Sequence, residues 1–231
     1  MVKHGLDVIR KAVQFLNPSQ TPVITMDEPL FCIAKQLQWY LPAEYGEREL
    51  VLLLGGLHEE KACWPLLGVL KNSGWVKMLC GSGTFTSGRA DSFVNCVHMK
   101  RTEYGHQVTA GVLFSLKSKA FEDNGTSESH EQWVSRREEE SMQFKYWNMV
   151  LRLEMMILCL VRSFREHNFS KYIECLKALA PWFFALNRTH YKRWLPVHLK
   201  DMADLKTMHP DVFEEFMTNG SFTGQKTLKR F

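Results

Sequence analysis

The chain has 231 residues, of which 45% are hydrophobic and 23% are charged. These values are ordinary for a globular protein, so the composition excludes a largely disordered chain and allows one large domain or two small ones. The formal net charge is +4, which permits contact with nucleic acid but is too small to indicate a dedicated nucleic-acid-binding protein.

The cysteines and the apolar runs indicate the compartment. Six cysteines are scattered along the chain and no two have CxxC spacing, which predicts reduced thiols, mostly buried in the core. The N-terminus lacks the basic-then-apolar pattern of a secretory signal. The longest apolar run, near residues 155–161, is too short to cross a bilayer. We therefore expect an intracellular protein that has no membrane segment.

The first 58 residues predict a helix and then a small α/β core. Residues 1–19 contain an amphipathic helix that Asn17-Pro18 ends. Within a core at 20–58, residues 23–27 predict a first strand and residues 49–54 a second, apolar throughout, as expected for a strand covered on both sides. Between them a helix runs to Tyr40, and its apolar positions fit one face: Leu30, Ile33, Ala34, Leu37 and Tyr40.

The rest of the chain predicts helices. Residues 59–220 form a helical region that resembles an insertion, with a polar loop at 122–130 and a kink or break at Pro181. Residues 221–231 are a polar, basic tail in which Phe222 and Leu228 suggest an extended strand. The predicted fold class is α/β to mostly α: a small, partial parallel sheet followed by a large helical region.

Polar side chains follow the two predicted strands. Asp27 ends the first, and His58 follows the second after Gly55-Gly56-Leu57. Because parallel strands present their carboxyl ends at one edge of a sheet, we expect these side chains at a common edge. Asp27 could hold Mg²⁺ or Mn²⁺, or it could cap the next helix. His58 could share that site, or it could be a structural histidine bonded to a backbone carbonyl.

Two strands cannot make a stable sheet alone, because three or more are needed. The simplest expectation is that the chain is a fragment, or that its sheet is completed by another chain. No Walker loop, GxSxG, HExxH or GxGxxG motif is present, so the sequence does not predict the common nucleotide-binding or hydrolase sites.

Basic residues suggest a nucleic-acid contact at two places. Lys100 and Arg101 could contact phosphates, although so short a run is a weak signal. The segment RTHYKRW interleaves Arg188, Lys192 and Arg193 with aromatic residues, a combination that can stack on and neutralise single-stranded nucleic acid. The alternative is an ordinary amphipathic helix whose aromatic side chains face a core.

Several runs together resemble one family, roughly over residues 20–223. They are ITMDEPLFCIAKQLQW, GLHEEKACWPLLGVLKNSGW, RADSFVNCVHMKRTEYGHQVTA and APWFFALNRTHYKRWLPVHLKDM. They are similar to a large, multi-copy family of invertebrate and fish proteins that is associated with transposons. That family has no established activity to carry over.

A more distant resemblance is to the central part of RNase H-like transposases. In those enzymes the second catalytic acid ends one strand, a histidine motif ends the next, and a helical insertion follows. The resemblance implies that Asp27 is the metal-binding carboxylate and that His58 is the motif histidine. The first acid has no candidate here, and the third, a glutamate, would lie beyond Phe231.

The resemblance therefore predicts a fragment of a transposon-derived, RNase H-like protein that is not catalytic alone. The ancestral reaction would be metal-dependent phosphodiester cleavage and strand transfer. The alternative is a helical protein-interaction module without enzymatic activity, favoured by 11 methionines and 7 tryptophans, because Met-rich surfaces adapt to partners. That alternative loses ground if all of these side chains are buried. DNA binding without cleavage is a third possibility.

Overall fold

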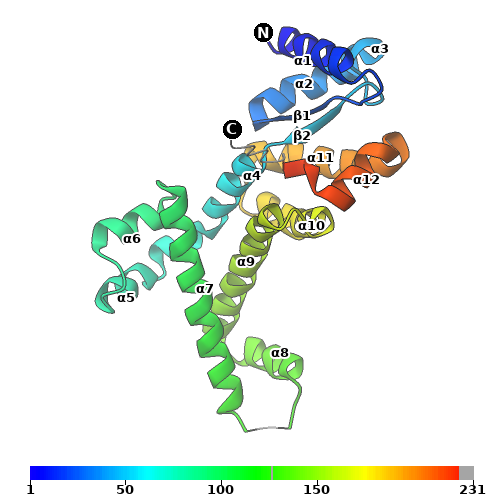
Figure 1. Cartoon of the computed structure of the whole chain (residues 1–231). Coiled ribbons are helices and arrows are strands. Elements are labelled where there is room, and N and C mark those ends of the chain that lie inside the picture. The colour runs from blue at the N-terminus through cyan, green and yellow to red at the C-terminus, as the bar shows by residue number, and fades with distance from the viewer. Residues whose placement is uncertain (126, 224–231) are drawn as a thin grey trace, which may run out of the picture. The chain divides into compact units, whose positions relative to one another are not determined.

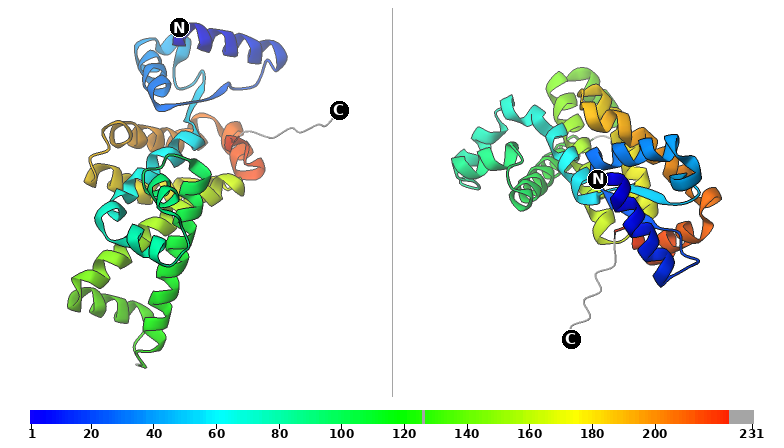
Figure 2. Two further views of the ribbon diagram at one scale, coloured as in Figure 1. Left: turned by 90° about the vertical axis from the view of Figure 1, so that its left-hand side faces the viewer. Right: turned by 90° about the horizontal axis from the view of Figure 1, so that it is seen from above.

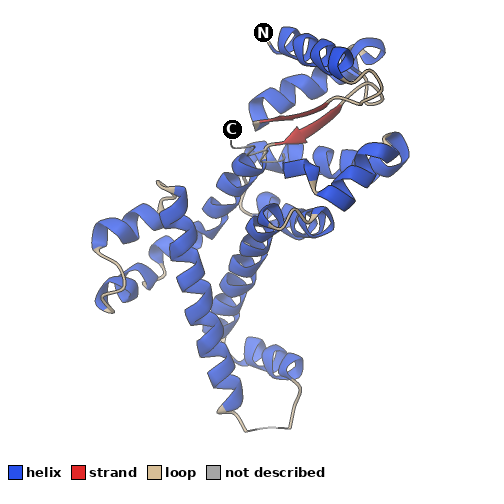
Figure 3. Cartoon of the chain, in the orientation of Figure 1, coloured by secondary structure: helices blue, strands red, loops and turns tan. Residues whose placement is uncertain are grey.

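The protein is mostly helical and has one small parallel sheet (Figures 1 and 3). The computed structural model describes residues 1–125 and 127–223. The chain forms two compact units: unit 1 contains Met1–Ala62 together with the residues from Leu160 on, and unit 2 contains Cys63–Cys159. The predicted α/β core and the last part of the predicted helical region thus lie in one unit.

Unit 1 begins with the elements predicted from the sequence, with small shifts at their ends. They are α1 (Val2–Leu16), β1 (Val23–Met26), α2 (Glu28–Tyr40) and β2 (Val51–Leu54). A short helix that was not predicted, α3 (Pro42–Tyr45), lies between α2 and β2. α4 (Gly56–Cys63) follows β2 directly. β2 ends at Leu54, as predicted, but His58, which was expected at the end of the strand, lies in the first turn of α4.

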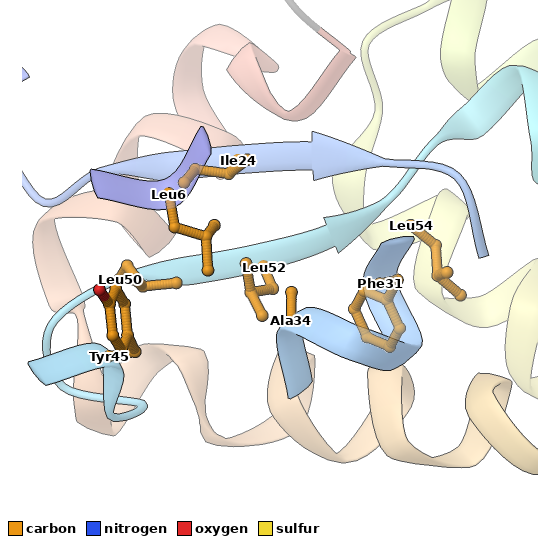
Figure 4. Packing of buried hydrophobic residues seen from close by; sticks show 8 residues of the cluster. All are labelled: Leu6, Ile24, Phe31, Ala34, Tyr45, Leu50, Leu52 and Leu54. Carbon is orange, nitrogen blue, oxygen red and sulfur yellow. The ribbon is translucent and has the colours of Figure 1, made fainter. Parts of the chain in front are cut away.

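The two predicted strands are confirmed and they pair in parallel, with Val23 opposite Val51 and Met26 opposite Leu54. All four β2 side chains are buried, as expected for a strand covered on both faces, whereas Thr25 of β1 is exposed. α1 and α2 stay beside the strands in all views (Figures 1 and 2). A buried cluster fills the space between the strands and these helices (Figure 4): Leu6, Ile24, Phe31, Ala34, Tyr45, Leu50, Leu52 and Leu54.

Several apolar residues of α2 that were predicted to be buried are exposed, and polar residues are buried instead. Phe31 and Ala34 are fully buried, but Leu30 and Ile33 are 44% and 45% exposed and Tyr40 is 80% exposed. The other buried positions of α2 are polar: Glu28, Lys35 and Gln38. Gln38 Nε2 donates to the backbone oxygen of Leu50 at 3.0 Å, so this buried amide covers an acceptor at the start of β2. The apolar stripe read from the sequence is therefore mostly an outer face.

The C-terminal part of unit 1 is a set of packed helices: α10 (Phe169–Ala185), α11 (Thr189–Met208) and α12 (Pro210–Asn219). Of the two outcomes predicted at Pro181, a kink or a break, the break is wrong, because α10 runs through this residue. Pro181 is exposed, so the carbonyl that loses its helical partner can bind water instead. Phe222 is buried within the 3₁₀ helix η2 (Ser221–Thr223), not in a strand. Leu228 lies outside the described residues.

Unit 2 is helical throughout its ordered elements. It contains the 3₁₀ helix η1 (Trp64–Asn72), α5 (Trp75–Gly81), α6 (Ser87–Val94), α7 (Met99–Glu122) and α8 (His130–Glu140), and α9 (Met142–Arg165) begins in it. Trp64, Phe93 and Trp133 are among its fully buried side chains. Ser129 and Gln132 form a capping box that starts α8, which explains why the predicted polar loop ends there.

No helix in the described part of the chain is both long enough and apolar enough to span a bilayer. This agrees with the absence of a long apolar run in the sequence.

Candidate functional site

The carboxyl ends of the two strands meet at one edge, as predicted. The backbone N–H of Gly55, directly after β2, donates to the oxygen of Met26 at 2.8 Å. Asp27 follows Met26 and is partly buried. The side chain of His58 is exposed, and its backbone N–H donates to Gly55. The edge is thus as expected, but His58 reaches it from a helix rather than from a strand end.

Asp27 is the N-cap of α2. Its Oδ1 accepts a hydrogen bond from the backbone N–H of Leu30 at 3.2 Å, so the alternative interpretation of Asp27 as a helix cap is confirmed. Among residues 1–125 and 127–223, no group of three or more His, Cys, Asp or Glu side chains could hold a metal ion. Mg²⁺ or Mn²⁺ at Asp27 would therefore find at most one further side chain of these types among the described residues, and its remaining ligands would be other oxygens, such as those of the backbone or of water.

A row of hydrogen-bonded, buried polar side chains, called here the buried polar chain, begins at Glu59, the residue after His58. Glu59 lies on α4 and is 1% exposed, whereas His58 is exposed. The hydroxyl of Tyr172 on α10 donates to Glu59 Oε1 at 3.0 Å and lies 2.6 Å from Nε2 of His198 on α11. Tyr172 and His198 are 2% and 0% exposed. Three elements of unit 1 therefore converge on one tyrosine hydroxyl.

Burial determines the charge of the two acid–base groups of the buried polar chain, Glu59 and His198. Desolvation raises the pKa of Glu59 to about 8, although the hydrogen bond from Tyr172 acts in the opposite direction. Desolvation lowers the pKa of His198 to about 3, and the positive charge of Lys35 adds to the effect. Both side chains are consequently neutral at pH 7, and the unpaired buried charge that would be most costly is avoided.

Two arrangements of protons fit these distances. In one, Tyr172 donates to Glu59 and the Nε2–H of His198 donates to Tyr172; in the other, protonated Glu59 donates to Tyr172, which donates to His198. Glu59 Oε2 and His198 Nδ1 have no hydrogen-bond partner among the described residues. The two arrangements also differ in the outer protons at Glu59 Oε2 and His198 Nδ1, so a change from one to the other requires a proton to be supplied at one end and removed at the other. Since both of these atoms are buried without a partner in the described part of the chain, the hydrogen bonds hold the three side chains in place.

A pocket of about 390 Å³ adjoins the buried polar chain at the edge of the sheet. Tyr172 belongs both to the polar chain and to the pocket wall. The described lining residues come from β1, β2, α4, α9, α10 and η2: Thr25, Leu53, Leu54, Gly56, Leu57, Glu60, Phe164, Tyr172, Phe222 and Thr223. The volume is in the range of small-molecule sites.

The basic residues predicted to contact nucleic acid do not form one group. Lys100 and Arg101 are exposed in the first turn of α7, in unit 2. Arg188 precedes α11 in unit 1, and exposed Arg193 and half-buried Lys192 lie on that helix. Lys192 Nζ donates to Asn187 Oδ1 at 2.6 Å. Nucleic-acid binding by these residues stays a prediction.

The aromatic residues of RTHYKRW pack inside unit 1. Tyr191 stacks on Phe183 with ring centroids 5.5 Å apart, and Trp194 stacks on Trp39 at 6.0 Å. Both side chains pack against the buried cluster below the strands. This supports the amphipathic-helix interpretation, because rings held by the core are less free to stack on bases.

Unit 2 contains a second buried acid–histidine pair. His106 Nδ1 lies 2.8 Å from Glu154 Oε1, and the two side chains are 2% and 0% exposed. The imidazole stacks on Trp64 with a centroid distance of 4.6 Å and meets Phe93 edge-on. Desolvation raises the pKa of Glu154, and the charge of His106 opposes this. The pair is thus enclosed by aromatic rings in the core of unit 2.

Comparison with known sequences places the chain in a family. The sequence model described as Domain of unknown function (DUF8702) matches residues 116–231, which is half of the chain. The chain belongs to this family. Tyr172 and His198 lie within the matched segment, whereas Asp27, His58 and Glu59 precede it. No curated protein matches the chain, and no solved structure matches it.

The sequence reading missed the buried polar chain, although a weak signal exists. His198 occupies a position of the regular stripe that Leu195, Met202 and Leu205 form on α11, and all four side chains are buried. Glu59 lies four residues before buried Cys63, on the same side of α4. A polar residue within an apolar stripe is thus the feature that could have pointed to these two side chains.

Proposed function

We propose that this protein is an intracellular, transposon-derived, RNase H-like association module that does not cleave nucleic acid by itself. In this proposal the outer face of α2 binds the same face of a second copy. The single observation that carries it is that four large apolar residues of α2, namely Leu30, Ile33, Trp39 and Tyr40, are exposed while both of its charged residues are buried.

The outer face of α2 is apolar and uncharged. Leu30 and Ile33 are 44% and 45% exposed, and Trp39 and Tyr40 are 50% and 80% exposed. The only charged residues of α2 are Glu28 and Lys35, which are 8% and 1% exposed. Contiguous exposed apolar side chains of this kind mark interaction surfaces in soluble proteins.

The spacing of these residues favours a second copy as the partner. Leu30, Ile33, Leu37 and Tyr40 repeat at intervals of three and four, the pattern with which helices pack side by side. A two-fold dimer brings identical surfaces together. Since this surface carries no charge, such a contact involves no repulsion between like charges.

The RNase H-like part of the proposal is supported by local architecture. A strand, a helix and a parallel strand follow one another, and Asp27 stands at the end of the first strand. The absence of cleavage is supported by the surroundings of Asp27, whose carboxylate caps α2. A site with two metal ions needs several converging acids, and the described residues bring no such group together.

Sedimentation velocity tests the dimer. We expect the wild-type protein to dimerise at micromolar concentration and the double variant Leu30→Glu/Ile33→Glu to be monomeric. Burial of each apolar side chain contributes about 1.5–3 kcal/mol, so losing both should raise the dimer dissociation constant more than about a hundredfold.

The matched control is Val112→Glu, because Val112 of α7 is 41% exposed and lies in the other unit. This variant should dimerise like the wild type. A wild-type protein that stays monomeric, or a double variant that dimerises equally well, would refute the role of α2.

A nuclease assay tests the second half of the proposal. With Mg²⁺ or Mn²⁺, we expect the chain to cleave neither single- nor double-stranded DNA, and Asp27→Ala to change nothing in this assay. The same substitution should lower the free energy of unfolding by about 1 kcal/mol, because α2 loses its cap. Metal-dependent cleavage that Asp27→Ala abolishes would show that a functional acidic site exists.

A further inference from the structure

A pocket of about 470 Å³ lies within unit 2 and is lined mainly by α5, α7, α8 and α9. Its wall contains three aromatic rings, those of Trp75 on α5 and of Phe144 and Trp147 on α9. It also contains two cationic side chains, Lys117 on α7 and Arg137 on α8. A concave, largely apolar wall with a few charged groups is typical of small-molecule sites, and the volume is in their range.

Two tryptophans form an angled aromatic part of the wall. The ring centroids of Trp75 and Trp147 are 5.4 Å apart, and their planes are inclined by 50°. Trp75 is 3% exposed and its Nε1–H donates to Thr109 Oγ1 at 2.9 Å, so this ring is fixed and its polar atom already has an acceptor. The buried side chains of Leu113 and Leu151 extend the wall. An aromatic ligand can therefore make the tilted ring contacts that stabilise aromatic pairs.

The ammonium group of Lys117 has no carboxylate bonded to it in the described part of the chain. Its Nζ donates to Asn148 Oδ1 at 2.9 Å, and Asn148 Nδ2 donates to Glu138 Oε1 at 2.6 Å. The buried amide of Asn148 thus stands between the two opposite charges. Burial lowers the pKa of Lys117, and the negative charge of Glu138 opposes this effect. Because an ammonium group has three donors, Lys117 can bind a further acceptor, and a negatively charged one would stabilise its charged form.

The charge of the wall is positive. Its described residues include Lys117 and Arg137 but no aspartate or glutamate. Neither Thr126 nor the segment 224–231, which lie outside the described part of the chain, contains an acidic residue. Arg137 Nη1 donates to Glu140 Oε2 at 3.1 Å, so the charge of Arg137 is partly compensated. The wall therefore favours a negatively charged ligand, with Lys117 as its main partner.

We propose that this pocket binds a small aromatic carboxylate. The carboxylate pairs with the ammonium group of Lys117, and the aromatic body lies against Trp75 and Trp147. This proposal concerns unit 2 and does not depend on dimerisation through α2.

Isothermal titration with 2-naphthoate and 2-naphthamide tests the role of charge, because the two probes differ in charge and hardly in shape. At neutral pH, naphthoate should bind about tenfold more tightly than naphthamide. Lys117→Met should weaken naphthoate binding by a similar factor and leave naphthamide almost unaffected. Met78→Glu changes a lining residue that is 62% exposed, and its carboxylate should weaken naphthoate binding more than naphthamide binding, because like charges repel.

Each variant has a matched control on α7. Lys119→Met removes the same charge at a position that is 74% exposed and is not among the lining residues. Val112→Glu adds a carboxylate at an exposed position that is also outside the described wall. Both controls should bind naphthoate like the wild type.

A saturated probe tests the aromatic part of the proposal. Decahydro-2-naphthoate keeps the carboxylate and the carbon skeleton but cannot make ring–ring contacts, so it should bind about fivefold more weakly than naphthoate. Equal or tighter binding of the saturated probe would show that the site does not select an aromatic ligand.

Three results would overturn the proposal as a whole. They are equal affinities for naphthoate and naphthamide, no naphthoate binding at millimolar concentration, and normal naphthoate binding by Lys117→Met. Circular dichroism shows whether the variants are folded. If Lys117→Met does not fold, Met78→Glu decides the question, because normal naphthoate binding by this variant would equally overturn the proposal.

Discussion

Replacing Lys35 with methionine should lower the free energy of unfolding by about 3 kcal/mol. Lys35 is 1% exposed, and its Nζ lies 3.0 Å from both Glu47 Oε1 and Asp201 Oδ2. It joins α2 to α11 and to the turn before β2. Methionine keeps the length of the side chain but removes the ammonium group.

The cost arises mainly from the acid that is left behind. The side chain of Asp201 is 15% exposed, and desolvation already raises its pKa against the effect of Lys35. Without the lysine, Asp201 must be buried as an unpaired charge or take up a proton, and both are unfavourable. Glu47 is affected less, because it is 38% exposed and can be hydrated.

Denaturant unfolding at neutral pH measures this effect. Lys200→Met is the matched control, because Lys200 lies on α11, is 65% exposed, forms its salt bridge with Asp204 on the surface and attracts Glu47 and Asp201 only at longer range; it should cost less than about 0.5 kcal/mol. The double variant Lys35→Met/Asp201→Asn should recover about half of the loss. If Lys35→Met were no more harmful than Lys200→Met, the buried ion pair would not stabilise the contact between α2 and α11.

Stability should also fall as the pH rises above neutrality, because of Glu59. Its folded-state pKa of about 8 exceeds the ordinary value of 4.5, so the folded protein keeps a proton that the unfolded chain releases. This contribution to stability is complete below pH 4.5 and is lost as the pH rises through about 8. His198, with a pKa lowered from 6.5 to about 3, behaves in the opposite way. Its contribution is complete above pH 6.5 and is lost on acidification.

Together, the two effects make the free energy of unfolding independent of pH over a limited range. Between pH 4.5 and 6.5 the slopes from Glu59 and His198 cancel, because the unfolded chain gains one proton at the histidine and loses one at the glutamate. Above pH 6.5 only Glu59 contributes, at about 1.4 kcal/mol per pH unit, so the loss by pH 8 should be about 2 kcal/mol.

Glu59→Gln tests this prediction, since an amide of the same shape can still accept the hydrogen bond from Tyr172 but cannot ionise. The free energy of unfolding at pH 6.5 and at pH 8 should differ by about 2 kcal/mol less in Glu59→Gln than in the wild type. Glu131→Gln, at an exposed site, should follow the wild-type profile. Parallel profiles for wild type and Glu59→Gln would mean that Glu59 is already ionised in the folded protein.

Local patterns predicted the strands and most helices. The apolar run at 50–54 and the Asp-Glu-Pro that starts α2 carry their signals within a few residues, so β2 and the cap at Asp27 could be read directly. Pro181 did not break the helix, since the residue is exposed and the carbonyl that it leaves without a helical partner can bind water.

Which side of α2 is buried, and whether Glu59 is buried, depend on packing against helices far away in the sequence. The apolar stripe of α2 predicted a buried side, but α11 provides partners for Lys35 and an edge contact from Trp194 to Phe31, and these determine which side is covered. Glu59 is buried by residues on α10 and α11, more than a hundred positions later in the chain. The residues close to Glu59 in the sequence therefore do not reveal that it is buried.

The alternative interpretation as an interaction module would have lost ground if all tryptophan and methionine side chains were buried. Some of them are exposed, Trp39 and Met78 among them, so this alternative stays open.

The order in which the chain is synthesised has a consequence for unit 1. Its strands and first helices emerge from the ribosome before residues 63–159, whereas the helices that complete its core follow them. Asp201 and His198 therefore cannot meet Lys35 and Glu59 until the whole of the intervening unit has been translated. During that interval Lys35 can pair only with Glu47, and Glu59 lacks Tyr172 and His198, so both side chains stay hydrated until the C-terminal half of unit 1 has been made.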